Sequence, residues 1–95
     1  MRFIQRQGFW HLIDENAPEE ACVIATLRND VEILVLKRFC ENYLGGSGLP
    51  TGEFDVQHDG RCYRVVPVRG TGGKLAFEIA GDDGSLARID TEFVI

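Results

Sequence analysis

The stretch that decides the fold is the second half of the chain, residues 53–95, which reads EFDVQHDGRCYRVVPVRGTGGKLAFEIAGDDGSLARIDTEFVI. Apolar and polar residues alternate along it, as they do in strands that bury one face of a sheet. Asp59-Gly60, residues 71–73 and residues 82–84 interrupt the alternation with residue types typical of tight turns. The pattern predicts four antiparallel strands in a meander with one buried face.

Pro67 lies inside the second predicted strand, residues 61–69. Proline has no backbone N–H to donate to a neighbouring strand, so it is confined to sheet edges and bulges. We therefore expect this strand to be bulged at Pro67 or to lie locally at an edge.

The first half of the chain is poor in glycine, because only Gly8 among the 11 glycines precedes Gly45. Glycine destabilises helix interiors, so helices are expected before Gly45 and strands and turns after it. Aromatic and β-branched side chains in residues 2–14 predict one or two strands at the start of the chain.

Two helices are predicted to follow these strands. Residues 17–28 are assigned to the first, because Asn16 can cap it and Pro18 suits its first turn. Residues 31–44 are assigned to the second, because their apolar side chains recur at helical spacing after a possible cap at Asp30.

A second interpretation makes residues 22–27 and 31–36 the two strands of a hairpin, since both are rich in β-branched residues. Either way the sequence predicts an α+β fold. N-terminal strands and one or two helices pack on one face of a C-terminal four-stranded antiparallel meander. One domain, residues 1–95, is expected. Its parts are residues 2–44 with the strands and helices, a glycine-rich connector at 45–52, and the meander at 53–95.

The charge balance limits the possible partners. Ten Lys and Arg residues against 15 Asp and Glu residues give a net charge of −5. Such a chain is not expected to bind nucleic acid or an anionic membrane through its overall field. The sequence has no signal-peptide pattern, and its longest apolar run, residues 33–36, is too short to span a bilayer. A cytoplasmic location is therefore expected.

The cysteines and histidines give no specific catalytic or metal-binding motif. Cys22, Cys40 and Cys62 are odd in number and widely spaced, which favours three free thiols over a disulfide framework. Together with His11 and His58 they lack the paired spacing of a zinc site. We expect no metal, no cofactor and no enzymatic activity. A small enzyme with a Cys/His site is kept as an alternative.

We expect a small acidic protein-binding module of the inhibitor or immunity type. It would dock on a basic surface of another protein through an acidic face, since charge complementarity steers such encounters. Exposed aromatic side chains are the usual anchors of such faces. The residues assigned to this function are Trp10, Asp14, Glu15, Glu19, Glu20 and Tyr43. A homodimer is left open, because a chain of this length has a small core.

The alternative of a nucleic-acid-binding protein rests on the basic hairpin at residues 61–74. This segment contains four cations, an aromatic residue and no acid. The residues that would contact nucleic acid are Arg61, Tyr63, Arg64, Arg69 and Lys74. Strict alternation would place Arg64 on the opposite face from Arg61 and Arg69, which weakens this alternative.

Overall fold

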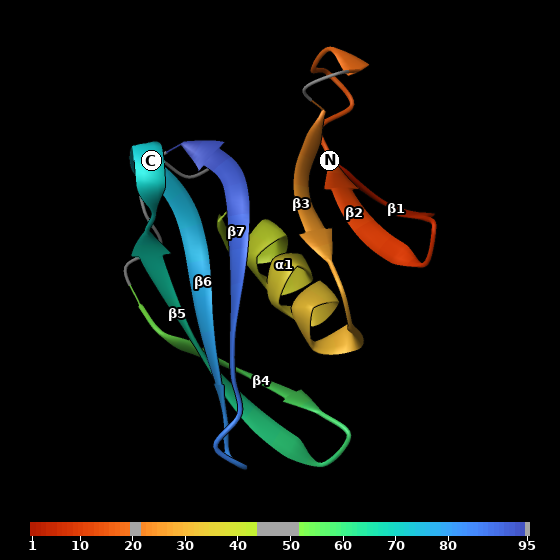
Figure 1. Ribbon diagram of the computed structural model, residues 1–95. Helices are drawn as coiled ribbons and strands as arrows, with labels where there is room; N and C mark the ends of the chain where they lie inside the picture. Colours follow the sequence, from red (N-terminus) through yellow and green to blue (C-terminus); the bar gives the residue numbers. More distant parts are fainter. Residues whose placement is uncertain (20–21, 44–51, 95) are drawn as a thin grey trace.

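The computed structural model describes residues 1–19, 22–43 and 52–94, and it has the α+β architecture that the sequence predicts (Figure 1). A three-stranded antiparallel sheet, ordered β1-β2-β3, comes first, and a four-stranded antiparallel sheet, ordered β4-β5-β6-β7, ends the chain. One helix, α1, connects the two sheets within the described part. The elements are β1 (Arg2–Arg6), β2 (Phe9–Ile13), β3 (Val23–Leu27), α1 (Asp30–Tyr43), β4 (Phe54–His58), β5 (Arg61–Arg69), β6 (Lys74–Gly81) and β7 (Leu86–Val94).

The C-terminal meander is confirmed strand by strand. Asp59 and Gly60 both have positive φ, 53° and 76°, as the two central residues of a type I′ hairpin turn require. Strand β5 pairs with β4 only as far as Val65, while its pairing with β6 continues through Pro67. Pro67 therefore lies at a local edge of the sheet without a bulge. This is one of the two outcomes that the sequence predicts.

The far end of this sheet carries an irregularity that the alternation does not reveal. The register between β6 and β7 shifts between Lys74 and Ala76. Here the buried Thr91 hydroxyl donates a hydrogen bond to the Leu75 carbonyl at 2.7 Å and accepts one from the Phe93 amide at 3.2 Å. The Thr91 side chain thus satisfies backbone groups that a regular ladder would pair.

The predicted helix at residues 17–28 is wrong, because β3 occupies its second half. In β3 the side chains of Ala25 and Leu27 are buried while Thr26 between them is exposed, which is the period of a strand. Ala25 pairs with Leu12 of β2, so burial against a neighbouring strand outweighs the local capping signals. The hairpin interpretation is correct only in predicting a strand over residues 23–27, because that strand pairs with β2 and residues 31–36 lie in α1.

Helix α1 packs against both sheets, near the place where their edge strands β3 and β7 approach one another (Figure 1). Its Val35, Leu36 and Phe39 are buried, and the Phe39 ring meets that of Phe77 edge to face at 5.3 Å. One cluster joins both sheets to this helix: Leu12, Ala25, Leu27, Val35, Leu36, Phe39, Val56, Val65, Leu75, Phe77, Ile79 and Ile89. The predicted connector falls outside the described residues except for Gly52.

Candidate docking surfaces

The acidic segment, which we define as Asp14, Glu15, Glu19 and Glu20, connects β2 to β3. The Asp14 amide donates to the Cys22 carbonyl at 2.8 Å, and the Asp14 carboxylate accepts the Asn16 amide at 3.0 Å. These bonds close the start of the loop while leaving the Glu15 and Glu19 side chains exposed. Within the described residues neither glutamate has an ion-pair or hydrogen-bond partner for its carboxylate. Glu20 lies outside the described residues.

Of the two predicted aromatic anchors, Trp10 does not lie beside this segment. Trp10 is half-buried on β2, where it pairs with Gln5 and Leu27 and packs against the central cluster. It lies near the β1–β2 turn, at the opposite end of β2 from Asp14. Tyr43 ends α1, and its side chain lies outside the described residues.

Two exposed apolar residues adjoin the acidic segment instead. Met1 precedes β1, whose first residue pairs with Ile13, and its side chain is 47% exposed. Val23, the first residue of β3, also pairs with Ile13 and is 39% exposed. An apolar centre with a charged rim is the usual composition of a protein–protein interface. Sequence reasoning missed both residues, because their exposure follows from the pairing of β1 and β3 with β2.

A second group of acids lies apart from the acidic segment and consists of Glu78, Asp82, Asp83, Asp90 and Glu92. The turn at residues 82–84 lies at the opposite end of the molecule from the β2–β3 connection (Figure 1). Most carboxylates of this group are held by cations of the second sheet. The pairs are Arg61–Asp83 at 2.8 Å, Arg88–Asp90 at 3.0 Å, Arg88–Glu78 at 3.8 Å and Lys74–Glu92.

The cations of the 61–74 hairpin are largely neutralised by the same pairing. Arg64 contacts Asp55 at 3.3 Å and Glu53 at 3.0 Å, and these carboxylates, Asp55 first, raise the pKa of its guanidinium. Arg61 and Lys74 have carboxylate partners as well, so Arg69 is the one cation of this hairpin without a partner among the described residues. Half-buried Tyr63 packs against the core cluster. The register runs unbroken from Tyr63 to Arg69 and keeps Arg64 on the opposite face from Arg69.

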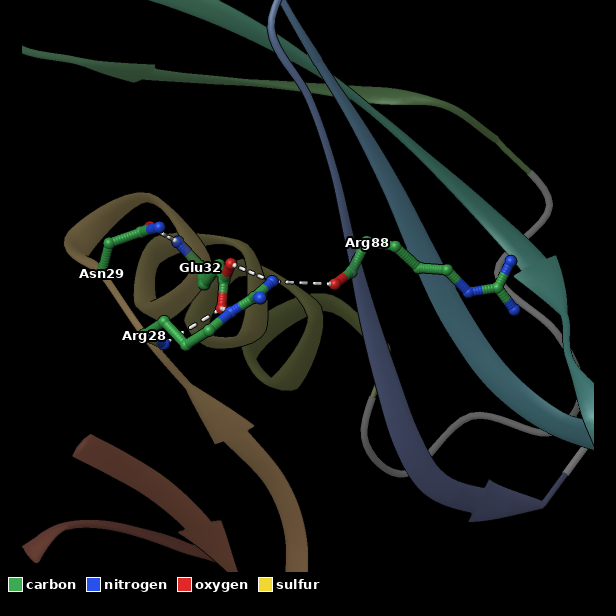
Figure 2. A network of polar contacts seen from close by, with 4 residues as sticks. All are labelled: Arg28, Asn29, Glu32 and Arg88. Atoms are coloured by element: carbon green, nitrogen blue, oxygen red, sulfur yellow. Dashed lines mark hydrogen bonds and ion pairs between the residues drawn. The ribbon is translucent and has the colours of Figure 1, made fainter.

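A buried carboxylate fixes the start of α1, and Figure 2 shows its contacts. Asn29, and not the predicted Asp30, is the N-cap: its side-chain oxygen accepts the Glu32 amide at 3.0 Å. The Glu32 side chain is 2% exposed and reaches back to accept the Arg28 amide at 3.0 Å, a variant of the capping box. The Arg28 guanidinium binds the same carboxylate at 3.1 Å and donates to the Arg88 carbonyl of β7 at 3.3 Å.

These contacts join the two sheets at their facing edges. Strands β3 and β7 are each the last strand of their sheet, and they approach one another beside Arg28. The seam between them is an open groove of about 340 Å³, lined by residues 23–26, Arg28, residues 88–90 and Glu92. Since both oxygens of Glu32 are already occupied, this network is structural and offers no free acid or base.

The outer face of the first sheet is the feature that sequence reasoning missed most fully. We define it by Arg2, Ile4, Arg6, Phe9 and His11. In the register Ile4 is opposite His11 and Arg6 is opposite Phe9, and directly paired residues share a face. The alternation along β1 already indicates that Arg2, Ile4 and Arg6 share one face of a strand. Only the pairing with β2 shows that this face is the one turned away from the core.

Among the described residues, no cysteine forms a hydrogen bond with a histidine. His58 pairs with Arg61, and Cys62 follows Arg61 on the same strand, so the side chains of His58 and Cys62 point to opposite faces of the sheet. His11 Nδ1 lies 3.1 Å from the Thr26 hydroxyl. Burial raises the pKa of the Cys40 thiol, which makes it less nucleophilic at neutral pH. The enzyme alternative stays a prediction.

Within the described ranges, no group of three His, Cys, Asp or Glu side chains is placed to hold a metal ion. No described helix is long and apolar enough to cross a membrane. The family models, the curated proteins and the solved structures compared with this chain give no match. The functional argument therefore rests on the chain's own geometry.

Proposed function

We propose that this chain is a non-enzymatic protein-binding module that docks on a basic surface of another protein through its acidic segment. The observation that carries the proposal is a difference between the two acidic groups. Glu15 and Glu19 are exposed and unpaired within the described part, whereas Asp83 and Glu92 are held by cations of their own sheet. More of the charge of the first group is therefore available to a partner.

The surroundings of the acidic segment support the same proposal. Met1 and Val23 add exposed apolar surface beside it, and strands β2 and β3 flank it in the chain. Exposed charges at a rim mainly accelerate association, while the apolar surface slows dissociation. Docking of this kind on a partner's functional surface would inhibit that partner, which is how the inhibitor or immunity role would arise.

The proposal is tested by capture and then by reconstitution. The tagged chain and two variants are used as bait in nuclease-treated lysate: Glu15→Lys with Glu19→Lys, and Glu41→Lys as a control at an exposed site on α1. A protein retained by the wild type and by the control, but lost with the double variant, is identified by mass spectrometry and purified.

Binding kinetics of the purified pair then test whether the acidic segment steers association. We expect the association rate constant to fall roughly tenfold or more between low salt and about 0.5 M salt, where the Debye length is only several Å. The double variant should slow association more than it accelerates dissociation. Equal retention by the wild type and by the double variant would show that the acidic segment is not the docking surface.

A further inference from the structure

We propose that the free edge of β1 binds an extended acidic peptide segment, which adds to the first sheet as a further strand. The inference goes beyond the docking function, because it concerns a different surface and a partner of the opposite charge. It stands on three observations: an edge strand with unpaired backbone groups, a gathering of unpaired cations around that strand, and a stretch of sequence without acids.

The edge comes first. Strand β1 is the first strand of its sheet, and among the described residues its only hydrogen-bonded neighbour strand is β2 (Figure 1). Gln7 and Gly8 have φ values of 54° and 83°, so they form a two-residue type I′ turn directly after Arg6. Arg6 and its partner across this turn are a hydrogen-bonded pair, and such pairs alternate along an antiparallel ladder. The backbone groups of Phe3 and Gln5 therefore point away from β2, toward the free edge.

Free backbone groups at a sheet edge are a template for another strand. An added strand satisfies the N–H and C=O groups of the edge, and these main-chain hydrogen bonds give affinity whatever the sequence of the added strand. Selectivity must then come from the side chains that flank the edge. Around β1 these include several cations.

The cations that have no partner gather at this strand. Four Lys or Arg side chains make no ion pair or hydrogen bond among the described residues: Arg2, Arg6, Lys37 and Arg69. Three of these four lie on or beside β1. Arg2 and Arg6 alternate along the strand and share the outer face of the sheet. Lys37 of α1 lies on the other side, where its Nζ is 5.9 Å from the centre of the Phe3 ring.

The sequence of the hairpin adds no opposing charge. Residues 1–13 contain two arginines and no Asp or Glu, although the chain as a whole has a net charge of −5. The acidic segment borders the Arg2 end, because Arg2 pairs with Ile13, the residue before Asp14. Arg6 is four residues from Arg2, or about 14 Å at about 3.4 Å per residue. This distance exceeds the Debye length of about 8 Å at physiological salt, so Arg6 is screened from the acidic segment.

An acidic extended strand is complementary to this edge. In a strand added to β1, every second side chain lies on the outer face, beside Arg2, Ile4 or Arg6. Carboxylates beside the two arginines and an apolar residue between them match this row. A cross-strand pair of opposite charges contributes about 0.2–1 kcal/mol, so binding should be selective and weak.

Other occupants fit this edge less well. A second copy of β1, paired antiparallel about Ile4, would set Arg2 opposite Arg6 twice, and like charges directly opposite are unfavourable. A single-stranded nucleic acid has phosphates for the arginines, but it has no strand backbone to pair with Phe3 and Gln5. An acidic peptide satisfies both the cations and the edge.

Titration of the full, isotope-labelled chain with two synthetic peptides tests the proposal. The first, acetyl-TETVTET-amide, places two glutamates and a valine on one face of a strand. The control peptide, acetyl-TKTVTKT-amide, has lysines in place of the glutamates. We expect the backbone amide resonances of Phe3 and Gln5 to shift with the acidic peptide only, with a Kd on the order of 0.1–1 mM at low salt.

Two variants separate the contributions of charge and backbone. Arg6→Glu reverses a charge beside the edge and should weaken binding roughly fivefold or more. Gln5→Pro removes a free-edge N–H while leaving the charges and the β1–β2 ladder intact, and it should weaken binding at least as much. Arg69→Glu is the control, because Arg69 is exposed and unpaired within the described part but belongs to the second sheet, and it should bind like the wild type. Circular dichroism confirms that each variant is folded.

Several results would overturn the proposal. They are the absence of a saturable shift up to about 5 mM acidic peptide, equal binding of the two peptides, and wild-type affinity in either folded variant. Tighter binding of an oligothymidylate to the same residues would also overturn it, in favour of nucleic-acid contact. The outcome is independent of the docking function, since the probe is acidic and no basic partner is present.

Discussion

The buried carboxylate of Glu32 gives the most specific stability prediction. Replacing Glu32 with Ala removes the acceptor of the Arg28 amide, at 3.0 Å, and the partner of its guanidinium, at 3.1 Å. The Asn29 cap remains, because it accepts the backbone amide of residue 32, but the Arg28 amide is left without an acceptor, which costs about 1–3 kcal/mol. The Arg28 side chain is 59% exposed and can return to water, which limits the total.

We therefore expect Glu32→Ala to lower the free energy of unfolding by about 2–3 kcal/mol, or the Tm by roughly 10–20 °C for a domain of this size. Glu32→Gln keeps an oxygen that accepts the Arg28 amide and loses only the charge, so about 1 kcal/mol is expected. Urea unfolding, followed by the fluorescence of Trp10, the single tryptophan, measures both.

Glu92→Gln is the matched control, because it neutralises a carboxylate that pairs with Lys74 at the surface. Its effect should stay below about 0.5 kcal/mol. If Glu32→Ala were no worse than this control, the buried network would not anchor α1. If Glu32→Gln lowered the free energy of unfolding as much as Glu32→Ala, the charge of Glu32 would stabilise the fold more than its hydrogen bond to the Arg28 amide.

Three further predictions follow from the described contacts. Thr91→Val removes the hydrogen bond to the Leu75 carbonyl and should cost about 1–3 kcal/mol in the same urea assay; an unchanged midpoint would contradict a stabilising role for that bond. Hydrogen bonds from Ser85, chiefly its side chain and then its amide, lower the pKa of Asp83. Because the folded pKa is depressed, the stability contributed by Asp83 is present above about pH 4 and is lost as the pH falls through the folded value. Asp83→Asn should therefore lose less stability on acidification, as followed by circular dichroism, and identical acid profiles would refute this. Burial raises the pKa of the Cys40 thiol, so iodoacetamide at pH 8 should alkylate it more slowly in the folded chain than in urea, as measured by peptide mass spectrometry.

The meander was predictable because its information is local. Alternation at period two marks the buried positions Val65, Phe77 and Ile89, and Asp59-Gly60 specifies a type I′ turn without help from the rest of the chain. The helix over 31–44 was predictable for the same reason, to within a residue at each end. Its true cap, Asn29, was displaced by one position from the predicted one.

Residues 17–28 show where local signals failed. Asn16, Pro18 and Glu19 resemble a helix start, but the two buried side chains of β3 fit only beside Leu12 of β2. A period-two pattern only five residues long is ambiguous until a neighbouring strand is known. The expectation that Trp10 is an exposed anchor met the same difficulty, since Trp10 packs against the core cluster while Phe9, which was not assigned a role, is exposed.

The sequence by itself determined the antiparallel meander, the helix before it, the net charge and the list of candidate acids and cations. Periodicity, turn chemistry and composition are properties of neighbouring residues, so they can be read without a fold. Only the tertiary structure decided which charges are available. Pairing across β4–β7 neutralises Arg61, Arg64 and Lys74, while Arg6, Glu15 and Glu19 find no partner among the described residues. Whether a charge is neutralised depends on what lies opposite it in space, and strand register sets that.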